Sequence, residues 1–412
     1  MNAQNDSVKL EQACRSGYFG AACISVLLAF IPQALFALGT RIPNQDAEST
    51  AKGNAVIASA DNPSAIYYNP AGITQIQDTE AQFGLHIISV NSHFEAAAGG
   101  SSDTKFEVQE VPQIYCVLPL QNAPQDHRIS LGLGVYAPYG LGLQWPGDAS
   151  LRNKGIEGRL LYASVAPVAA IEILPGLSFA AGPTFNYSTV KLRTGVGLVP
   201  GDTFRYTGHG TAIGAKLGIR WQPCEQWAFG ASWISPTTVN YDGGSTIKPE
   251  TAGKHGTKAS LDFPQFVMAG ISFRPTPKWN LEVGMDWTDW DTVNTTTFEG
   301  PAFGNIPFAF NWHSTFMVYS GIKRSFDNHY WVAGGYFYSP NSTGDRDFSP
   351  IIPDTDLHVA SLGFGHKGQR WDWALSGQII TGPAREVHNG NVADGKYNFF
   401  NQAVNASITY HF

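Results

Sequence analysis

The 412-residue chain has little charge and little cysteine. Charged residues make up only 14% of it, and 26 basic against 33 acidic residues give a net charge of −7 without any basic stripe. A protein that follows a phosphate backbone needs such a stripe, so nucleic acid is excluded as a partner. Outside the N-terminal region the cysteines are Cys116 and Cys224, too few and too far apart for a disulfide framework. Cys or His pairs at ligand spacing are also lacking, so no metal and no cofactor are predicted.

The chain contains one long apolar run, from Tyr18 to Leu38, and this run follows a polar segment with basic residues. The order is typical of a signal peptide, which predicts export and assigns residues 1–37 to a cleaved leader. We expect cleavage near Ala37 or Gly39. The alternative is an uncleaved anchor, but Pro32 interrupts the run, and a helical span needs about 20 unbroken apolar residues.

Beyond this run, short stretches alternate apolar and polar residues up to the last position. The clearest stretch has Trp279, Leu281, Val283, Met285 and Trp287 on one face, with Asn, Glu, Gly and Asp between them. A period of two predicts β-strands. We predict fourteen strands, near residues 81–94, 111–120, 129–137, 159–173, 177–193, 206–221, 227–240, 258–274, 279–290, 312–324, 330–339, 357–366, 371–381 and 398–412.

Two features predict that the apolar faces meet lipid and not a protein core. Tryptophans lie near strand ends, as at Trp221, Trp279 and Trp371, where their rings would sit at a membrane interface. Tight turns such as 174–176 alternate with longer polar loops, as short periplasmic turns alternate with long external loops in outer-membrane barrels. The predicted fold class is therefore all-β, a 14-stranded antiparallel transmembrane β-barrel over residues 81–412.

The last eight residues alternate again and end in Phe412. A terminal Phe after alternating apolar residues resembles the signal that the outer-membrane assembly machinery recognises, so this machinery is a predicted partner. The final strand of a soluble sheet is the alternative for this feature alone. Together with the exported N-terminus, the ending predicts a monomer in the outer membrane of a Gram-negative bacterium, in contact with membrane lipid and lipopolysaccharide.

Residues 38–80 do not alternate, and they contain the steps Asn62-Pro63 and Asn69-Pro70. Proline removes a backbone donor and forces extended or turn geometry on the residue before it. Such a segment cannot lie in lipid, where each unsatisfied backbone group costs several kcal/mol. Its small apolar residues favour packing as a hatch, or plug, inside the lumen. The alternative is a disordered leader.

The same segment resembles part of a known family. The pattern G-x-A-x-x-x-x-A-D-x-P-S-A-x-x-x-N-P-A-G, from Gly53 to Gly72, resembles the hatch of the FadL/TodX family of outer-membrane long-chain fatty-acid and hydrocarbon transporters. A-P-Y-G-L at 137–141 is similar to the segment in which the family's third strand kinks inward. W-T-D-W at 287–290 and Y-S-P at 338–340 follow in the family's order.

The resemblance implies passive transport of a hydrophobic small molecule. A ligand would be captured among the external loops, pass to an apolar pocket, and leave sideways through the third-strand opening into the outer leaflet. The kink would involve Pro138 and Gly140, although Gly140 could also be an ordinary loop glycine. The residues that the resemblance implies for the hatch and its gating are Gly53, Asn69, Pro70 and Ala71.

A fatty-acid carboxylate would need a buried cation, and three residues are candidates for ligand binding. His313 stands where the family's tenth strand has a basic residue, and strand parity predicts that it faces inward. With an ordinary pKa near 6.5 it would be a weaker, pH-dependent anchor. Arg193 shares parity with lipid-facing residues, so it either turns inward at a bulge or lies above the membrane. Lys216 is the remaining inward cation.

Because His313 replaces the basic residue expected from the family, two ligand classes stay open. They are long-chain fatty acids and neutral or aromatic hydrocarbons. Two other functions suit the same barrel, a nonspecific porin without a hatch and a surface adhesin without transport. No motif places a nucleophile beside a base and an orienting acid, so the chain is not expected to be an enzyme.

Overall fold

The structure, a computed structural model, describes residues 39–120, 128–197, 199–249, 253–300 and 304–412. The predicted signal peptide lies outside the described residues. Most of the described chain is β-structure, in 21 segments joined into one sheet whose pairings are antiparallel. The described helices are all too short for a bilayer crossing.

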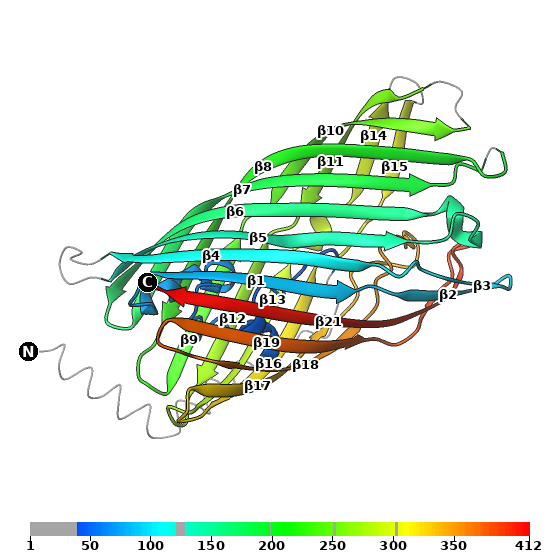
Figure 1. The fold of residues 1–412 in the computed structure, drawn as a ribbon. Coiled ribbons are helices and arrows are strands. Elements are labelled where there is room, and N and C mark those ends of the chain that lie inside the picture. The colour runs from blue at the N-terminus through cyan, green and yellow to red at the C-terminus, as the bar shows by residue number, and fades with distance from the viewer. Residues whose placement is uncertain (1–38, 121–127, 198, 250–252, 301–303) are drawn as a thin grey trace, which may run out of the picture.

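The sheet closes into a barrel because its first and last strands pair (Figure 1). β1 (Glu80–Ser89) lies beside β21 (Gly395–His411), with Glu80 opposite His411 and Ser89 opposite Gln402. Closure leaves no edge of unpaired backbone groups facing lipid. The other wall strands are β4 (Val108–Leu120), β5 (Ile129–Gln144), β6 (Glu157–Leu174), β7 (Leu177–Thr194), β8 (Thr203–Trp221), β9 (Trp227–Ile234) with β10 (Thr237–Lys248), β11 (His255–Phe263) with β12 (Phe266–Phe273), β13 (Trp279–Thr288), β16 (Thr315–Ser325), β17 (Tyr330–Ser339), β18 (Leu357–His366) and β19 (Trp371–Thr381).

Two pairs of these segments are each one interrupted strand, so the wall has the 14 strands predicted from the sequence. Shorter strands extend the wall at the end away from the C-terminus (Figure 1). They are β2 (Ser92–Ala96), β3 (Ser101–Asp103), β14 (Thr295–Gly300), β15 (Gly304–Ala309) and β20 (Arg385–Val387). The predicted fold class is confirmed.

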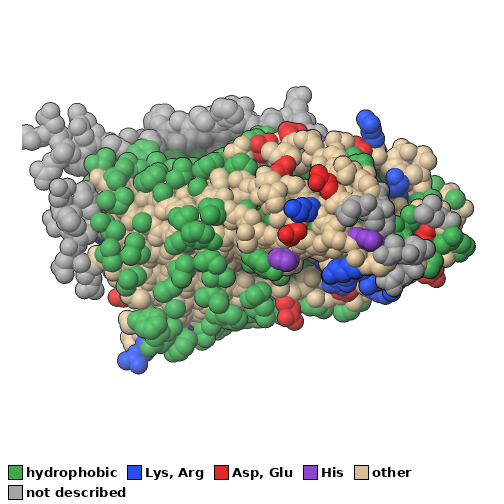
Figure 2. Space-filling view, turned by 90° about the horizontal axis from the view of Figure 1, so that it is seen from above, with side chains coloured by type: hydrophobic (Ala, Val, Ile, Leu, Met, Phe, Trp, Pro, Cys, Tyr) green, Lys and Arg blue, Asp and Glu red, His purple; other side chains and the backbone are tan. Residues whose placement is uncertain are grey.

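Alternation divides the side chains of each wall strand between the outside and the lumen. On β8, Ile213, Leu217 and Ile219 lie on the outer face, Ile213 with 73% of its surface exposed, whereas Lys216 and Arg220 are buried. Figure 2 shows hydrophobic side chains covering the end of the barrel that carries the C-terminus, with most charged side chains toward the other end. An apolar band of this extent is stable in contact with acyl chains, as in outer-membrane barrels.

Several strand limits differ from the predicted ones, and at two strands the difference affects a candidate site residue. The strand predicted at 129–137 continues as β5 to Gln144, past a bulge. The strand predicted at 312–324 begins only at Thr315, so His313 does not lie on the inward face of a strand. Asn311 has a left-handed backbone with φ of 43°, which interrupts the extended chain, and the N–H of His313 donates to the carbonyl of Ser342 at 3.0 Å.

Residues 39–79, here called the hatch, lie inside the barrel and are mostly buried. They form the helices α3 (Ala47–Ala51) and α4 (Ala65–Tyr68) and the 3-10 helix η1 (Pro70–Gln75). Asp46 caps α3 by accepting the N–H of Ser49 at 2.9 Å. Because α3 packs against β17, β18, β19 and β21 while η1 packs against β5 to β8, the hatch reaches from one side of the lumen to the other.

Candidate functional site

The barrel wall is incomplete between β4 and β5. Their pairing runs from Leu120 opposite Ile129 to Ile114 opposite Val135, whereas β4 pairs with β1 as far as Val108. Within the described chain, residues 108–113 of β4 therefore have no strand partner on the β5 side. We call this gap the wall opening.

The wall opening begins at a bulge in β5. From Tyr136 to Tyr139, β5 advances three residues while β6 advances two, from Ser164 to Tyr162. The extra residue reverses the alternation of β5 and turns Tyr139 into the lumen, where only 3% of its surface is exposed. Pro138 lies in this bulge, where its missing N–H interrupts no ladder.

The start of the hatch lies against the kinked part of β5. The N–H of Ile42 donates to the carbonyl of Pro138 at 2.8 Å, and the N–H of Gly140 donates to the carbonyl of Thr40 at 2.9 Å. These bonds flank an antiparallel bridge between Arg41 and Tyr139. A Cβ at Gly140 would lie 2.7 Å from Cδ1 of Ile42, so a side chain there would force the Ile42 side chain of the hatch to move. Both residues that the resemblance implied for the kink thus contact the hatch.

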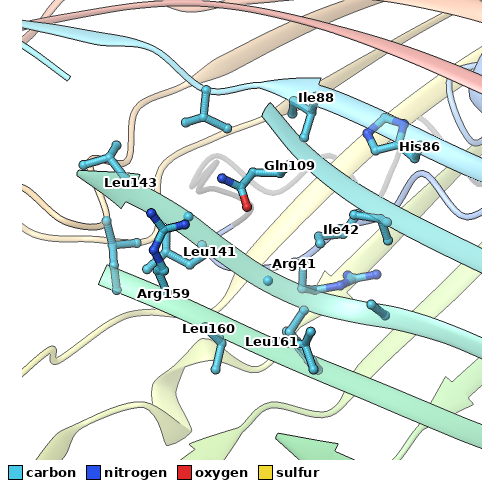
Figure 3. A pocket seen from close by; sticks show the side chains of 18 of the residues that line it. Arg41, Ile42, His86, Ile88, Gln109, Leu141, Leu143, Arg159, Leu160 and Leu161 are labelled. Atoms are coloured by element: carbon cyan, nitrogen blue, oxygen red, sulfur yellow. The ribbon is translucent and has the colours of Figure 1, made fainter. Parts of the chain in front are cut away.

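A cavity of about 760 Å³ lies at the wall opening. Figure 3 shows His86, Ile42 and Arg41 at one end of it and Leu143 and Arg159 at the other. Leu160 faces the lumen and Leu161, 50% exposed, faces outward, yet both line the cavity. Neighbouring residues of one strand point to opposite faces, so the cavity passes through the wall.

A second, smaller cavity of about 100 Å³ lies deeper, toward the external extensions of the barrel. It shares six lining residues with the first cavity, Leu141, Arg159, Leu160, Val190, Lys191 and Ile352. The rest of its lining is mostly apolar and includes Tyr241, Leu261, Val293, Phe298, Phe308 and Trp312. The two cavities together form an apolar route from the external loops toward the wall opening.

The buried cation beside the cavity is neutralised. Arg41 and Asp286 are 2% and 1% exposed, and Nη1 of Arg41 lies 2.6 Å from both carboxylate oxygens. The same nitrogen donates to Oγ1 of Thr288 at 2.7 Å, and the guanidinium stacks 3.7 Å from the ring centre of Phe266. This pair holds the start of the hatch to β13.

Cations at the outer rim of the cavity also have carboxylate partners. Lys191 Nζ and Arg159 Nε lie 2.6 Å and 2.9 Å from the same oxygen of Glu157, and Arg159 contacts Glu107 at 2.6 Å. Arg193 also lies 3.6 Å from Glu157, so three cations share the carboxylates of Glu157 and Glu107 at the rim. The cations that line the cavity, Arg41, Arg159 and Lys191, each already have a carboxylate partner.

The three cations predicted as ligand contacts lie elsewhere in the described chain, and none lines either cavity. Lys216 is fully buried, and its Nζ donates to the hatch carbonyls of Ile66 and of Tyr67, the latter at 2.8 Å. Arg193 continues the outward face of β7 without a bulge, with Nε 3.6 Å from Glu157. His313 is half-buried in an external loop, where burial lowers its pKa.

Of the four residues predicted for the hatch and its gating, Asn69 bonds the hatch to the wall and Gly53 packs closely against it. Oδ1 of Asn69 accepts the N–H of Ala71 at 3.2 Å, and Nδ2 donates to the carbonyls of Ile57 and Ile219, each at 2.9 Å. Pro70 begins η1. Gly53 has φ of +60°, and a Cβ there would lie 2.7 Å from the backbone nitrogen of Tyr336.

Sequence reasoning missed the ion pairs between the hatch and β13. Arg41 and Lys52 are the basic residues of the hatch, and they meet Asp286 and Glu282, with Lys52 Nζ 3.4 Å from Glu282. The alternation of β13 already placed both acids in the lumen. Because a buried carboxylate needs a partner, these two acids could have predicted that two basic residues of the hatch lie beside them.

The described chain forms a closed barrel with a hatch inside its lumen and an opening in its wall. The class so defined is that of outer-membrane transport barrels. Residues 28–372 match the model of the outer membrane protein transport protein family (OMPP1/FadL/TodX), and the chain belongs to this family. It is therefore an outer-membrane transporter of hydrophobic compounds and not an enzyme, which confirms the predicted family, class and location.

Solved structures show the same fold at low sequence identity. A FadL homologue of Pseudomonas aeruginosa superimposes with a TM-score of 0.77 at 17% identity, covering 92% of this chain and 100% of that one. The toluene transporter TodX of P. putida gives 0.69 at 15%, covering 92% and 99%. The toluene transporter TbuX of Ralstonia pickettii gives 0.70 at 14%, covering 89% and 98%.

A curated relative matches over a shorter region. An outer membrane protein of Neisseria meningitidis serogroup B is 29% identical over 135 residues, which are 30% of this chain and 28% of that protein. The match thus covers less than a third of the relative's length.

Proposed function

We propose that this chain takes up hydrophobic small molecules passively, from the external loops into the apolar cavities and then sideways through the wall opening into the outer leaflet. The observation that carries this proposal is the cavity lined by both Leu160 and Leu161. A hydrophobic solute that leaves sideways avoids exposing its apolar surface to water, at about 25 cal/mol per Å². The concentration gradient drives the transport.

The charges around the cavity support neutral ligands over fatty-acid anions. Arg41 already pairs with Asp286, and Arg159 and Lys191 share Glu157. A carboxylate would have to break one of these pairs or be buried without a partner, which costs several kcal/mol. We therefore propose neutral hydrophobic compounds as the ligands, with long-chain fatty acids as the second candidate because Arg159 and Lys191 lie at the rim.

The buried hatch supports transport of this kind over a porin that admits polar solutes. Liposome swelling with sugars tests this point, since a porin would pass them and this chain should not. The assembly machinery at Phe412, lipopolysaccharide at the outer surface and the monomeric state stay predictions.

Deletion of Pro138 tests sideways release. Without the extra residue, β5 regains its step-by-step register with β6 and can pair with residues 108–113 of β4, which closes the wall opening. We expect uptake of labelled decane to fall to the level of cells without the gene, while the purified variant still binds decane. Decanoate in parallel separates the two ligand classes.

The matched control is Pro138→Ala, which keeps the residue count and should keep most of the uptake. Folding is checked by the heat-dependent migration that intact barrels show on gels. If the deletion variant folds and transports decane at the normal rate, sideways release is wrong.

A further inference from the structure

His86 is a buried polar side chain of the cavity lining whose chemistry the transport route leaves unused. It lies on the inward face of β1, with 1% of its surface exposed, and it lines the cavity at the wall opening. In the described part of the chain no group lies within hydrogen-bonding distance of its buried Nδ1. A buried polar group without a partner is rare in native structures and calls for an explanation.

In the described chain, none of the amide side chains beside His86 on the wall bonds to its Nδ1. Three amide side chains lie on the same inward surface, and each turns its NH₂ group to the hatch and leaves its oxygen without a partner in the described chain. The bonds to the hatch are Gln82 Nε2 to Asp46 Oδ1 at 2.9 Å, Gln113 Nε2 to Asn44 O at 3.2 Å and Asn405 Nδ2 to Thr50 Oγ1 at 3.1 Å.

The register brings these acceptors close to His86. Asn405 lies directly opposite His86 on β21, and the oxygen of Gln113 covers Gly84, where a Cβ would lie 2.5 Å from it. Val111, opposite His86 on β4, is apolar. Among the described residues the wall thus leaves Nδ1 without a partner, and the cavity that His86 lines is the side from which a partner can come.

We propose that His86 binds the hydroxyl group of a neutral hydrophobic ligand, an alcohol or a phenol. This assignment rests on the proposed uptake route and names the ligand class within it. A hydroxyl both donates and accepts, so it suits either tautomer of the imidazole. An alkane offers no partner, an ether only accepts, and a carboxylate adds a charge that no cation of the lining is free to balance.

The position of His86 also sets the orientation of the ligand. Figure 3 shows His86 at the hatch end of the cavity and Leu141 and Leu143 toward its other end. A chain molecule bound by its hydroxyl at His86 lays its apolar tail along these leucines. The cavity volume of about 760 Å³ is within the range of ordinary small-molecule sites.

The test compares four ten-carbon ligands, 1-decanol, decyl methyl ether, decane and decanoate, as competitors of a fluorescent apolar probe on the purified full chain. We expect 1-decanol to bind about fivefold more tightly than the ether, as one neutral hydrogen bond provides. In His86→Phe the affinities for 1-decanol and the ether should be about equal. The ratio between variants cancels the partitioning of each ligand into detergent.

Two further variants support the comparison. His86→Gln offers an amide oxygen at the same place and should retain part of the preference, and it replaces His86→Phe if that variant does not fold. His209→Phe changes an exposed outward histidine of β8 and should behave as the natural chain does.

The outcomes separate this inference from the proposed function. If the natural chain binds all four ligands equally, or if His86→Phe keeps the preference for 1-decanol, the assignment to His86 is overturned while uptake stands. If the natural chain binds neither decane nor 1-decanol, the proposed function fails as well.

Discussion

Replacing Asp286 with asparagine should free the start of the hatch from the wall opening. The substitution removes the charge that balances Arg41, whose Nη1 lies 2.6 Å from both oxygens of Asp286 in a buried site. Removing one member of a buried ion pair costs about 3–5 kcal/mol, because the other charge stays buried. At about 1.4 kcal/mol per factor of ten, the undocked population of the segment should rise about 100-fold to 1,000-fold or more.

Amide hydrogen exchange measures this population directly. The N–H of Ile42, which donates to Pro138, and the N–H of Gly140, which donates to Thr40, should lose protection by this factor in Asp286→Asn. The double variant Arg41→Leu with Asp286→Leu should recover part of the protection, since it leaves no charge unpaired. Asp262→Asn, at a surface acid bonded to a threonine, is the matched control. Unchanged exchange at Ile42 in Asp286→Asn would refute the reasoning.

Two further predictions concern the hatch and an external loop. Gly53→Ala should lower the unfolding temperature more than Gly99→Ala. Both glycines have positive φ, but only at Gly53 would a Cβ clash with backbone, 2.7 Å from the nitrogen of Tyr336. Equal decreases in the unfolding temperature would contradict this clash. Burial raises the pKa of Asp354 from 3.8 to about 6, so the folded chain holds a proton between these values that the unfolded chain releases. Stability should therefore be highest below pH 4 and fall by about 2–3 kcal/mol as the pH rises through 6, and Asp354→Asn should remove this slope in thermal unfolding.

Strands with lipid on one face were predictable almost to the residue. The predicted limits 330–339, 357–366 and 371–381 are those of β17, β18 and β19. Their outward positions are apolar except near the strand ends, at His358, His366 and Thr381, because lipid accepts few polar side chains along the middle of a strand. A local pattern is enough when one face of a strand meets a uniform solvent.

The prediction failed where alternation breaks. The bulge at Pro138 reverses the parity of β5, so the residues after it no longer follow the pattern of the strand before it. His313 was placed by parity on a strand that begins only at Thr315. A one-residue insertion moves every later side chain to the other face, and alternation alone does not mark it, although the resemblance at 137–141 pointed to a kink there.

The sequence by itself determined the barrel, the direction of its faces and a hatch that could not lie in lipid, because these follow from local alternation and from backbone groups that need partners. Only the tertiary structure decided where the wall opens and which charges are available there. Arg41 and Asp286 are 245 residues apart in the chain. From the sequence alone Arg41 looks available to bind an anionic ligand, but its contact with Asp286 neutralises it. Long-range pairing of this kind depends on the closed barrel, which brings distant segments together.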